Sequence, residues 1–248
     1  MIPGNQRSPN GSSHRDAGHP PNLRAALSSM QLADSFFPSG LFTLSHGLET
    51  FAQAGLLTPA TLASTVAELL RASVGPTDAA GMALAMRAAR DGQMDEVARI
   101  DHRLTAMKIC REPRETSTRL GRQLLGISRD VFDSELARDY LELVNERRAP
   151  GNQVIALALL KTTLGVPIPE AVAGELYSFA ASCVSATVRM SVIDHRNAQR
   201  ILLLLQPVIE SATADALDRS LHELGGSAPF VELMSMRHET AELRLFSS

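Results

Sequence analysis

The apolar residues of this chain recur with the spacing of an α-helix from Leu23 almost to the C-terminus. Leu, Ala, Val and Met carry the pattern, whereas aromatic residues make up only 4% of the 248 residues and Trp is absent. Apolar residues three and four apart form one face of a helix, and a β-sandwich would instead alternate apolar with polar residues and use more Tyr, Phe and Thr. The sequence therefore predicts an all-α protein, with a single compact domain of about ten helices over residues 23–248.

Glycines, prolines and capping residues divide this pattern into segments. Gly75-Pro76 and Pro207 are predicted to separate helices, because proline lacks the N–H that an interior helical position donates. The run Val154–Leu160 has the hydrophobicity of a buried strand, but its alanines and its length favour a helix that is buried on all sides. The expected helices cover residues 23–33, 45–55, 58–70, 77–86, 94–109, 113–127, 134–145, 152–164, 170–192, 197–205 and 207–224, and a last stretch runs from Val231 to the end.

Residues 1–22 differ from the rest of the chain. They contain four prolines among Gly, Ser and Asn, with almost nothing to bury, and this composition predicts a disordered leader. His14 and His19 lie in it without cysteine or carboxylate neighbours, so no metal site is predicted there.

Charge and cysteine content exclude several classes of function. The net charge of −3 does not predict a nucleic-acid partner. The longest run of Ile and Leu alone is Ile201–Leu205, far short of the ~20 residues of a spanning helix, so we expect no membrane partner and a cytoplasmic location. Cys110 and Cys183 are the two cysteines, and both are expected to be buried free thiols.

No catalytic, cofactor-binding or metal-binding motif is found. Lys161-Thr162-Thr163 ends like a phosphate-binding loop, but Ala and Leu precede it where glycines are required, so it reads as the end of a helix. His222-Glu223 and His238-Glu239 lack the second His of a zinc-protease helix. Ser45-His46 is interpreted as a helix-capping Ser beside a surface or interface His, because adjacent helical side chains point about 100° apart.

Three segments are candidates for contacts with other proteins. The stretch Phe36–Phe42 holds three of the eight Phe residues beside Pro38 and Gly40, which fits either a loop folded into the core or a partner surface. An arginine-rich region around Arg119 and Arg122 is either a solvated face or an interface. The apolar end of the chain, Leu243–Ser248, either docks on its own domain or inserts into another protein.

These three segments resemble the UreF family of urease accessory proteins. The family signature Asp-Ser-x-Phe-Pro-x-Gly-x-Phe-x-x-Ser-x-Gly-Leu-Glu is matched by Asp34, Ser35, Phe37, Pro38, Gly40, Phe42, Ser45, Gly47, Leu48 and Glu49. Arg119-Leu-Gly-Arg-Gln-Leu-Leu125 is similar to the family's helix with paired Arg, and Arg244-Leu245-Phe246-Ser247 is similar to its closing tail. The resemblance covers Leu23–Ser248. The chain departs from the family at His46, where many relatives carry Tyr, and at Phe36, Ser39 and Leu41.

The resemblance implies an all-α, non-catalytic chaperone component that dimerises and binds two accessory proteins. One is a UreD/UreH-type scaffold, for which Arg244, Leu245, Phe246 and Ser247 would form the docking site. The other is the GTPase UreG, with Arg119 and Arg122 on a surface that faces UreG or the second copy. Nickel and GTP would be handled by the partners, with no cofactor bound directly, and the complex would act on apo-urease.

Two alternatives belong to other classes. A helical enzyme would assemble its site from distant residues, with Asp34, His46, Glu49 and His195 as its members. A helical adaptor unrelated to urease would share the fold without the nickel-dependent role.

Overall fold

The computed structural model describes residues 23–34, 36–40, 44–227, 234 and 236. Every regular element within these residues is helical and they form one compact domain, which confirms the predicted fold class. A π-helical stretch, Leu70–Ala79 (the π segment), joins two of the α-helices, and a 3₁₀ turn, Leu221–Glu223, follows the last. The α-helices are α1 (Leu23–Ala33), α2 (Leu48–Gln53), α3 (Leu62–Leu69), α4 (Ala80–Arg90), α5 (Met94–Met107), α6 (Arg111–Phe132), α7 (Glu135–Asn145), α8 (Gln153–Thr163), α9 (Ile168–Arg189) and α10 (His195–Asp218). The expected leader lies outside the described residues.

Helix α8 forms the centre of the core. All of its residues from Gln153 to Lys161 are buried, and it packs against α4, α6 and α7. The apolar run Val154–Leu160 is therefore a helix buried on all sides, as predicted, and Lys161–Thr163 is its C-terminal end. The approach of α6 to the start of α8 requires glycine at position 121, because a Cβ atom there would lie 2.1 Å from the carbonyl oxygen of Gly151.

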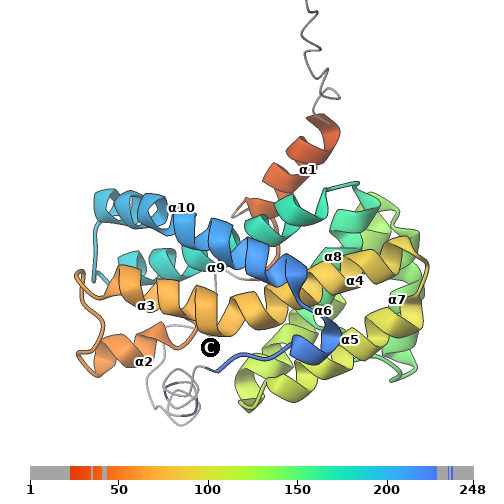
Figure 1. The fold of residues 1–248 in the computed structure, drawn as a ribbon, viewed down its shortest axis with the longest axis horizontal. Helices are drawn as coiled ribbons and strands as arrows, with labels where there is room; N and C mark the ends of the chain where they lie inside the picture. The colour runs from red at the N-terminus through yellow and green to blue at the C-terminus, as the bar shows by residue number, and fades with distance from the viewer. Residues whose placement is uncertain (1–22, 35, 41–43, 228–233, 235, 237–248) are drawn as a thin grey trace, which may run out of the picture.

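The two expected proline breaks are wrong. Helix α3, the π segment and α4 form one continuous rod (Figure 1), with Pro76 inside it. The wider π turn opens the regular hydrogen-bond ladder, so the missing proline N–H costs less there than in an α-helix. Pro207 lies inside α10, on its exposed side, where water can satisfy the carbonyl that the proline leaves unpaired.

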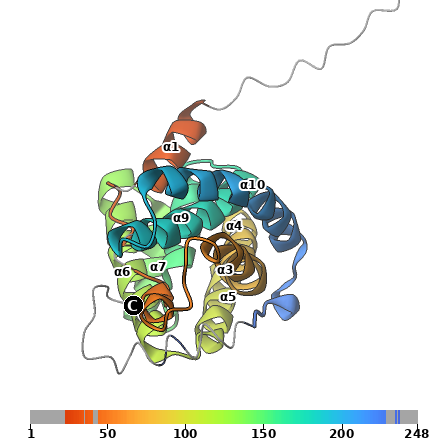
Figure 2. The same ribbon diagram turned by 90° about the vertical axis from the view of Figure 1, so that its left-hand side faces the viewer.

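Helix α1 projects away from the body of the domain, as both views show (Figures 1 and 2). It contacts α9, and only Ala25 and Leu32 of its residues are buried. Helix α10 packs along α9 and also contacts the π segment. The first helix of the domain is thus attached to it through one narrow face.

Helix α9 is the only helix in the described part of the chain that is long and apolar enough, by length and composition, to cross a membrane. In the fold, 61% of that apolar window is buried. Its neighbours are α10, α4 and the π segment, so it has the surroundings of a core helix.

A buried carboxylate joins three helices. Asp101 in α5 accepts hydrogen bonds from the Tyr140 hydroxyl of α7 at 2.6 Å and from the Gly151 amide at 2.7 Å. The Asn152 side chain, at the N-terminus of α8, donates to Asp101 at 2.6 Å. Burial, followed by the charge of Asp101, raises the pKa of Tyr140 above its ordinary value, so the phenol stays a donor. The network fixes the turn that starts α8.

Candidate functional site

The signature segment 34–49 is divided between the core and the surface. Phe37 is buried and its ring meets that of Phe132 edge-on, with centroids 6.4 Å apart. Phe36, held by a hydrogen bond from its N–H to Asp34 Oδ1 at 2.7 Å, is 96% exposed. The loop therefore both enters the core and presents an aromatic ring to solvent, while Ser35 and Phe42 lie outside the described residues.

The two signature glycines have different physical roles. Gly40 has φ +77°, and a Cβ atom there would lie 2.3 Å from the Leu120 side chain of α6. Gly47 has φ +81° and is the N-cap of α2, so the expectation that Ser45 caps this helix is wrong. Ser45 is buried instead. Glu49 is buried in the first turn of α2, where a carboxylate is stabilised by the helix dipole.

His46 is partly buried and contacts α9. Its Nε2 lies 3.1 Å from Ser182 Oγ, and its ring centroid is 4.5 Å from that of Phe179. Burial lowers the pKa of His46 to about 4, because the charged imidazolium loses its hydration. The imidazole is therefore neutral near pH 7.

The other residues of the alternative enzyme site lie in different surroundings. The Asp34 carboxylate accepts from the amide of Phe36 in its own loop. His195 is the exposed first residue of α10. Within the described part of the chain, no group of three or more His, Cys, Asp or Glu side chains could hold a metal ion.

The arginine-rich face is on α6. Arg119 and Arg122 are both exposed, and Arg122 donates to Asn145 Oδ1 of α7 at 3.3 Å. Their role at an interface stays a prediction. The tail residues Arg244, Leu245, Phe246 and Ser247 lie outside the described residues, so their docking role also stays a prediction.

Helix α1 carries an apolar stripe that has no cover among the described residues. Leu23, Leu27 and Met30 are each more than 60% exposed. At about 100° per residue these three positions fall within one arc of the helix, opposite the buried Ala25 and Leu32. A helix that buries only a narrow face against its own domain and exposes large apolar side chains to solvent is typical of a docking surface.

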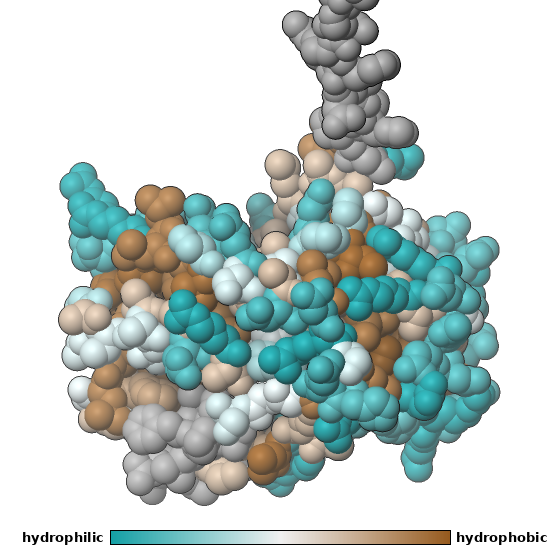
Figure 3. Space-filling view, viewed as in Figure 1, coloured by the Kyte–Doolittle hydropathy of each residue, from teal (hydrophilic) through white to brown (hydrophobic). Residues whose placement is uncertain are grey.

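A second exposed apolar area lies on α10. Leu203 and Leu204 are 64% and 66% exposed. Figure 3 shows apolar side chains gathered over this helix at the upper left of the face. Together with the α1 stripe, this gives the domain two apolar surfaces on its first and last long helices.

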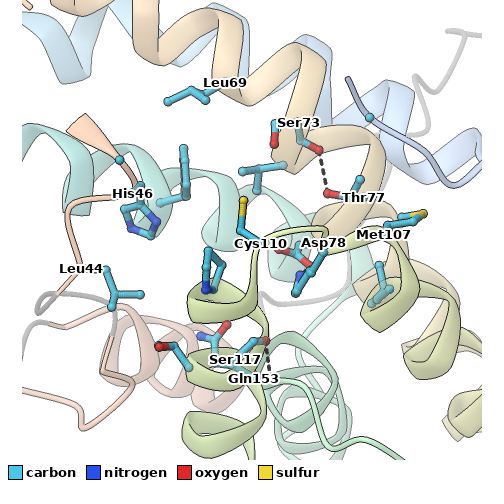
Figure 4. A pocket seen from close by; sticks show the side chains of 18 of the residues that line it. Leu44, His46, Leu69, Ser73, Thr77, Asp78, Met107, Cys110, Ser117 and Gln153 are labelled. Atoms are coloured by element: carbon cyan, nitrogen blue, oxygen red, sulfur yellow. Dashed lines mark hydrogen bonds and ion pairs between the residues drawn. The ribbon is translucent and has the colours of Figure 1, made fainter. Parts of the chain in front are cut away.

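A cavity of about 250 Å³ lies between the π segment, the start of α6, and α9 (Figure 4). Its walls include the apolar side chains of Leu69, Leu104 and Phe179, and His46 lies at one side. Its polar lining includes Asp78 and Lys108, which form an ion pair of 2.6 Å, and also Gln153 and Glu175.

Two of these residues each have a buried side-chain atom without a hydrogen-bond partner among the described residues: Glu175 Oε2 and Gln153 Nε2. Lys161 Nζ lies 3.8 Å from Glu175 Oε2, beyond hydrogen-bond distance, and donates instead to the Ala171 carbonyl at 2.9 Å. Burial raises the pKa of Glu175 and lowers the pKa of Lys161, and the attraction between the two opposes both shifts.

Sequence reasoning did not find this cavity. Its polar groups come from the π segment, the α5–α6 turn, α8 and α9, with no motif spacing that joins them. The one available signal was a lone charge inside each of two apolar helices, Lys161 in α8 and Glu175 in α9. Such charges are rarely buried unless they are paired or functional.

Comparison with known proteins identifies the family. The UreF family model matches residues 56–206. The urease accessory protein UreF of Bacillus sp. (strain TB-90) is 30% identical over 227 residues, which cover 91% of this chain and all of that protein. The UreF protein of Trichodesmium erythraeum (strain IMS101) is 30% identical over 92% of this chain and 98% of its own length. The UreF protein of Arthrobacter sp. (strain FB24) is 32% identical over 90% of this chain and 96% of its own length. With this match over most of its length, the chain belongs to the UreF family of urease accessory proteins.

Proposed function

We propose that this chain is a non-catalytic, cytoplasmic chaperone component that bridges a UreD/UreH-type scaffold and the GTPase UreG so that nickel enters apo-urease. The relatives are named accessory proteins of urease, which supports a role in its maturation. In this proposal nickel and GTP are carried by the partners, and this chain supplies surfaces that hold the assembly together.

The observation that carries the proposal is the apolar stripe Leu23–Leu27–Met30 on α1. Exposure of three large apolar side chains to water on one face is unfavourable. A partner that covered them would stabilise the complex by about 25 cal/mol per Å² of apolar surface removed from water. The stripe lies next to the exposed Phe36 in sequence and projects from the domain (Figure 1). We assign it, together with the tail Arg244–Ser247, to the UreD/UreH-type scaffold.

The remaining surfaces are assigned to UreG and to a second copy of this chain. Exposed arginines are suited to bidentate contacts with carboxylates of a partner, so Arg119 and Arg122 are assigned to UreG or to the homodimer. The Leu203–Leu204 area on α10 is a further candidate for the contact between copies.

A co-purification experiment with the scaffold tests the docking surface. Leu27→Asp places a charge in the centre of the stripe, and Ser28→Asp adds the same charge on the flank of the same helix. We expect Leu27→Asp, and separately the deletion of residues 244–248, to weaken capture of the scaffold at least tenfold, with Ser28→Asp close to wild type. Capture by Leu27→Asp at wild-type affinity would remove α1 from the interface.

Co-expression with apo-urease and nickel tests the function itself. Urease activity should depend on this chain, and the double variant Arg119→Glu/Arg122→Glu should reduce activity by loss of UreG from the complex. The double variant Arg138→Glu/Arg147→Glu, at exposed positions of α7 and of the turn that follows it, serves as the charge-matched control. Full activity without the chain would favour the helical adaptor unrelated to urease, and turnover of a substrate by the purified chain would favour the enzyme.

A further inference from the structure

We propose that a second copy of this chain docks on α10, with the two α10 helices antiparallel across a twofold axis. The observation that carries the proposal is an exposed stripe of α10 that is complementary to itself when the helix is reversed. The contact specifies the surface between copies that the proposed function includes, and it rests on that function for its role. Its geometry rests on α10 alone.

The stripe runs along the side of α10 that faces away from the domain. Its positions recur every three or four residues, the spacing with which one helix packs along another. At about 100° per residue they fall within an arc of about 80°, opposite the buried Ala198, Leu205 and Ala212. The stripe consists of the exposed residues Arg196, Arg200, Leu203, Pro207, Glu210, Ala214 and Asp218.

The chemistry of the stripe changes from one end to the other. Arg196 and Arg200 lie in its first part, and Leu203 lies at its centre. Glu210 and Asp218 lie in its last part. A parallel copy of the helix would set like charges together, whereas an antiparallel copy sets bases against acids and the apolar centre against itself.

A twofold axis at the height of Leu205 brings the matching residues level with each other. Both helices rise by 1.5 Å per residue, so residues equally far before and after Leu205 lie at the same height. Arg200 therefore meets Glu210 of the second copy. In the same way Leu203 meets Pro207 of the second copy. Two symmetric ion pairs then flank an apolar centre.

The charges of α10 are also reversed with respect to its helix dipole. The first turn contains no acidic residue and the last turn of this described helix contains no basic residue. Acids near the N-terminus and bases near the C-terminus are the stabilising arrangement, and here only the N-cap, Asp194, follows it. An antiparallel second copy supplies the missing charges, because its acidic end lies beside the N-terminus of the first helix and its basic end beside the C-terminus.

The stripe makes few contacts within its own domain. Arg200 donates to Asn197 of the same helix at 3.1 Å. The ion pairs between described residues involve neither arginine of the stripe and neither of its acids. Leu203 is exposed, within the apolar area over α10 in Figure 3. Its charges and its apolar centre are therefore available to a second copy.

The length of the stripe sets the strength of the contact. From Arg196 to Asp218 it spans about 33 Å at 1.5 Å per residue. One helix from each copy buries an area near the ~1,200 Å² lower limit of stable interfaces. We therefore expect a reversible dimer with a dissociation constant of about 10 μM.

Sedimentation equilibrium of the purified full-length chain tests the contact in the absence of other proteins. Leu203→Asp puts a charge in the apolar centre and should weaken self-association about tenfold or more. Val131→Asp, the same kind of change at a position of α6 that is 70% exposed, should leave self-association unchanged. Circular dichroism confirms that each variant is folded.

Charge reversal tests the antiparallel register. Arg200→Glu sets glutamates against each other at both ends of the contact and should weaken self-association about tenfold, as should Glu210→Arg. Arg138→Glu on exposed α7 is the matched control and should have no effect. An equal mixture of the Arg200→Glu and Glu210→Arg chains restores opposite charges at both ends, and the double variant Arg200→Glu/Glu210→Arg does so within one chain. Both should associate about as tightly as the wild type.

Three results would overturn the proposal. A wild-type chain that stays monomeric up to about 1 mM, a hundred times the expected constant, has no such contact. Unchanged self-association of a folded Leu203→Asp chain would place the second copy on another surface. Failure of both the mixture and the double variant to restore association would show that Arg200 and Glu210 do not meet.

Failure of this contact and failure of the proposed function give different results. Capture of the UreD/UreH-type scaffold is measured on the same Leu203→Asp chain. A wild-type chain that is monomeric, with capture of the scaffold lost on Leu203→Asp, would assign the stripe to the scaffold and overturn the dimer. Self-association that responds to the variants as expected supports the contact, and urease activation that does not need the chain would then contradict the proposed function alone.

Discussion

Replacing Asp101 by Asn isolates the contribution of the buried network that positions α8. One Asp101 oxygen accepts from Tyr140 and Gly151, and the other accepts from the Asn152 side chain and, at 3.2 Å, from the Asn152 amide. The Asn variant turns one oxygen into an NH₂ group. At Oδ2 this removes the acceptor of Tyr140 and Gly151, and at Oδ1 it sets an NH₂ group against the Asn152 donors, which keep Oδ2 and Thr105 Oγ1 as acceptors. Each lost acceptor costs about 1–3 kcal/mol, and we expect the free energy of unfolding to fall by about 3 kcal/mol.

Urea denaturation followed by circular dichroism measures this change. Tyr140→Phe removes one donor and leaves the carboxylate with its other partners, so it should cost only about 1–2 kcal/mol. Asp95→Asn, a change of the same kind at an exposed position of α5, should stay within about 0.5 kcal/mol of wild type. A loss below about 1 kcal/mol for Asp101→Asn, or one equal to that of Tyr140→Phe, would contradict the assignment of this network as the anchor of α8.

Two further predictions concern a glycine pair and a histidine. Gly121→Ala should destabilise the domain by about 3 kcal/mol, because its Cβ would overlap the Gly151 carbonyl; Gly126→Ala on the same helix meets nothing within 4 Å and should stabilise by about 0.5–1 kcal/mol. Equal unfolding midpoints for the two variants would refute the close approach of α6 to α8. His46 has a folded pKa of about 4, below its ordinary 6.5, so its contribution to stability is present above pH 6.5 and is lost as pH falls towards 4. In NMR its ring should not titrate near pH 6.5, and His46→Gln should show a smaller loss of stability on acidification; a midpoint near 6.5 would show that the ring is hydrated.

The regular core was predictable because its physics is local. Helical spacing and alanine content identified Val154–Leu160 as a helix before any tertiary contact was known, and the helix end at Lys161–Thr163 followed from the missing glycines. The predictions of helix breaks at the two prolines were wrong because they considered the local sequence alone. The cost of Pro76 and Pro207 depends on whether the helical turn widens or faces water, and only the packing decides that.

The site was less predictable because it depends on contacts between distant segments. The sequence of the Phe36–Phe42 loop was compatible with either a core or a surface role. In the structure Phe37 is buried and its neighbour Phe36 is exposed. His46 was expected at a surface or interface, yet its partner Ser182 lies on α9, far along the chain. The polar atoms of the cavity come from four segments, so no single stretch of sequence carries its pattern.

The π segment also determines how α4 is rotated relative to α3 about their common axis. On one side α3 faces α10, and on the other α4 faces α8 and α5. Each residue turns an α-helix by about 100°, so deleting a single residue of the segment would swing the apolar face of α4 away from α8. The same deletion would move Asp78 out of the cavity lining. The length of the π segment therefore has to be kept, and insertions or deletions should be tolerated far less within Leu70–Ala79 than in the turns that flank the rod.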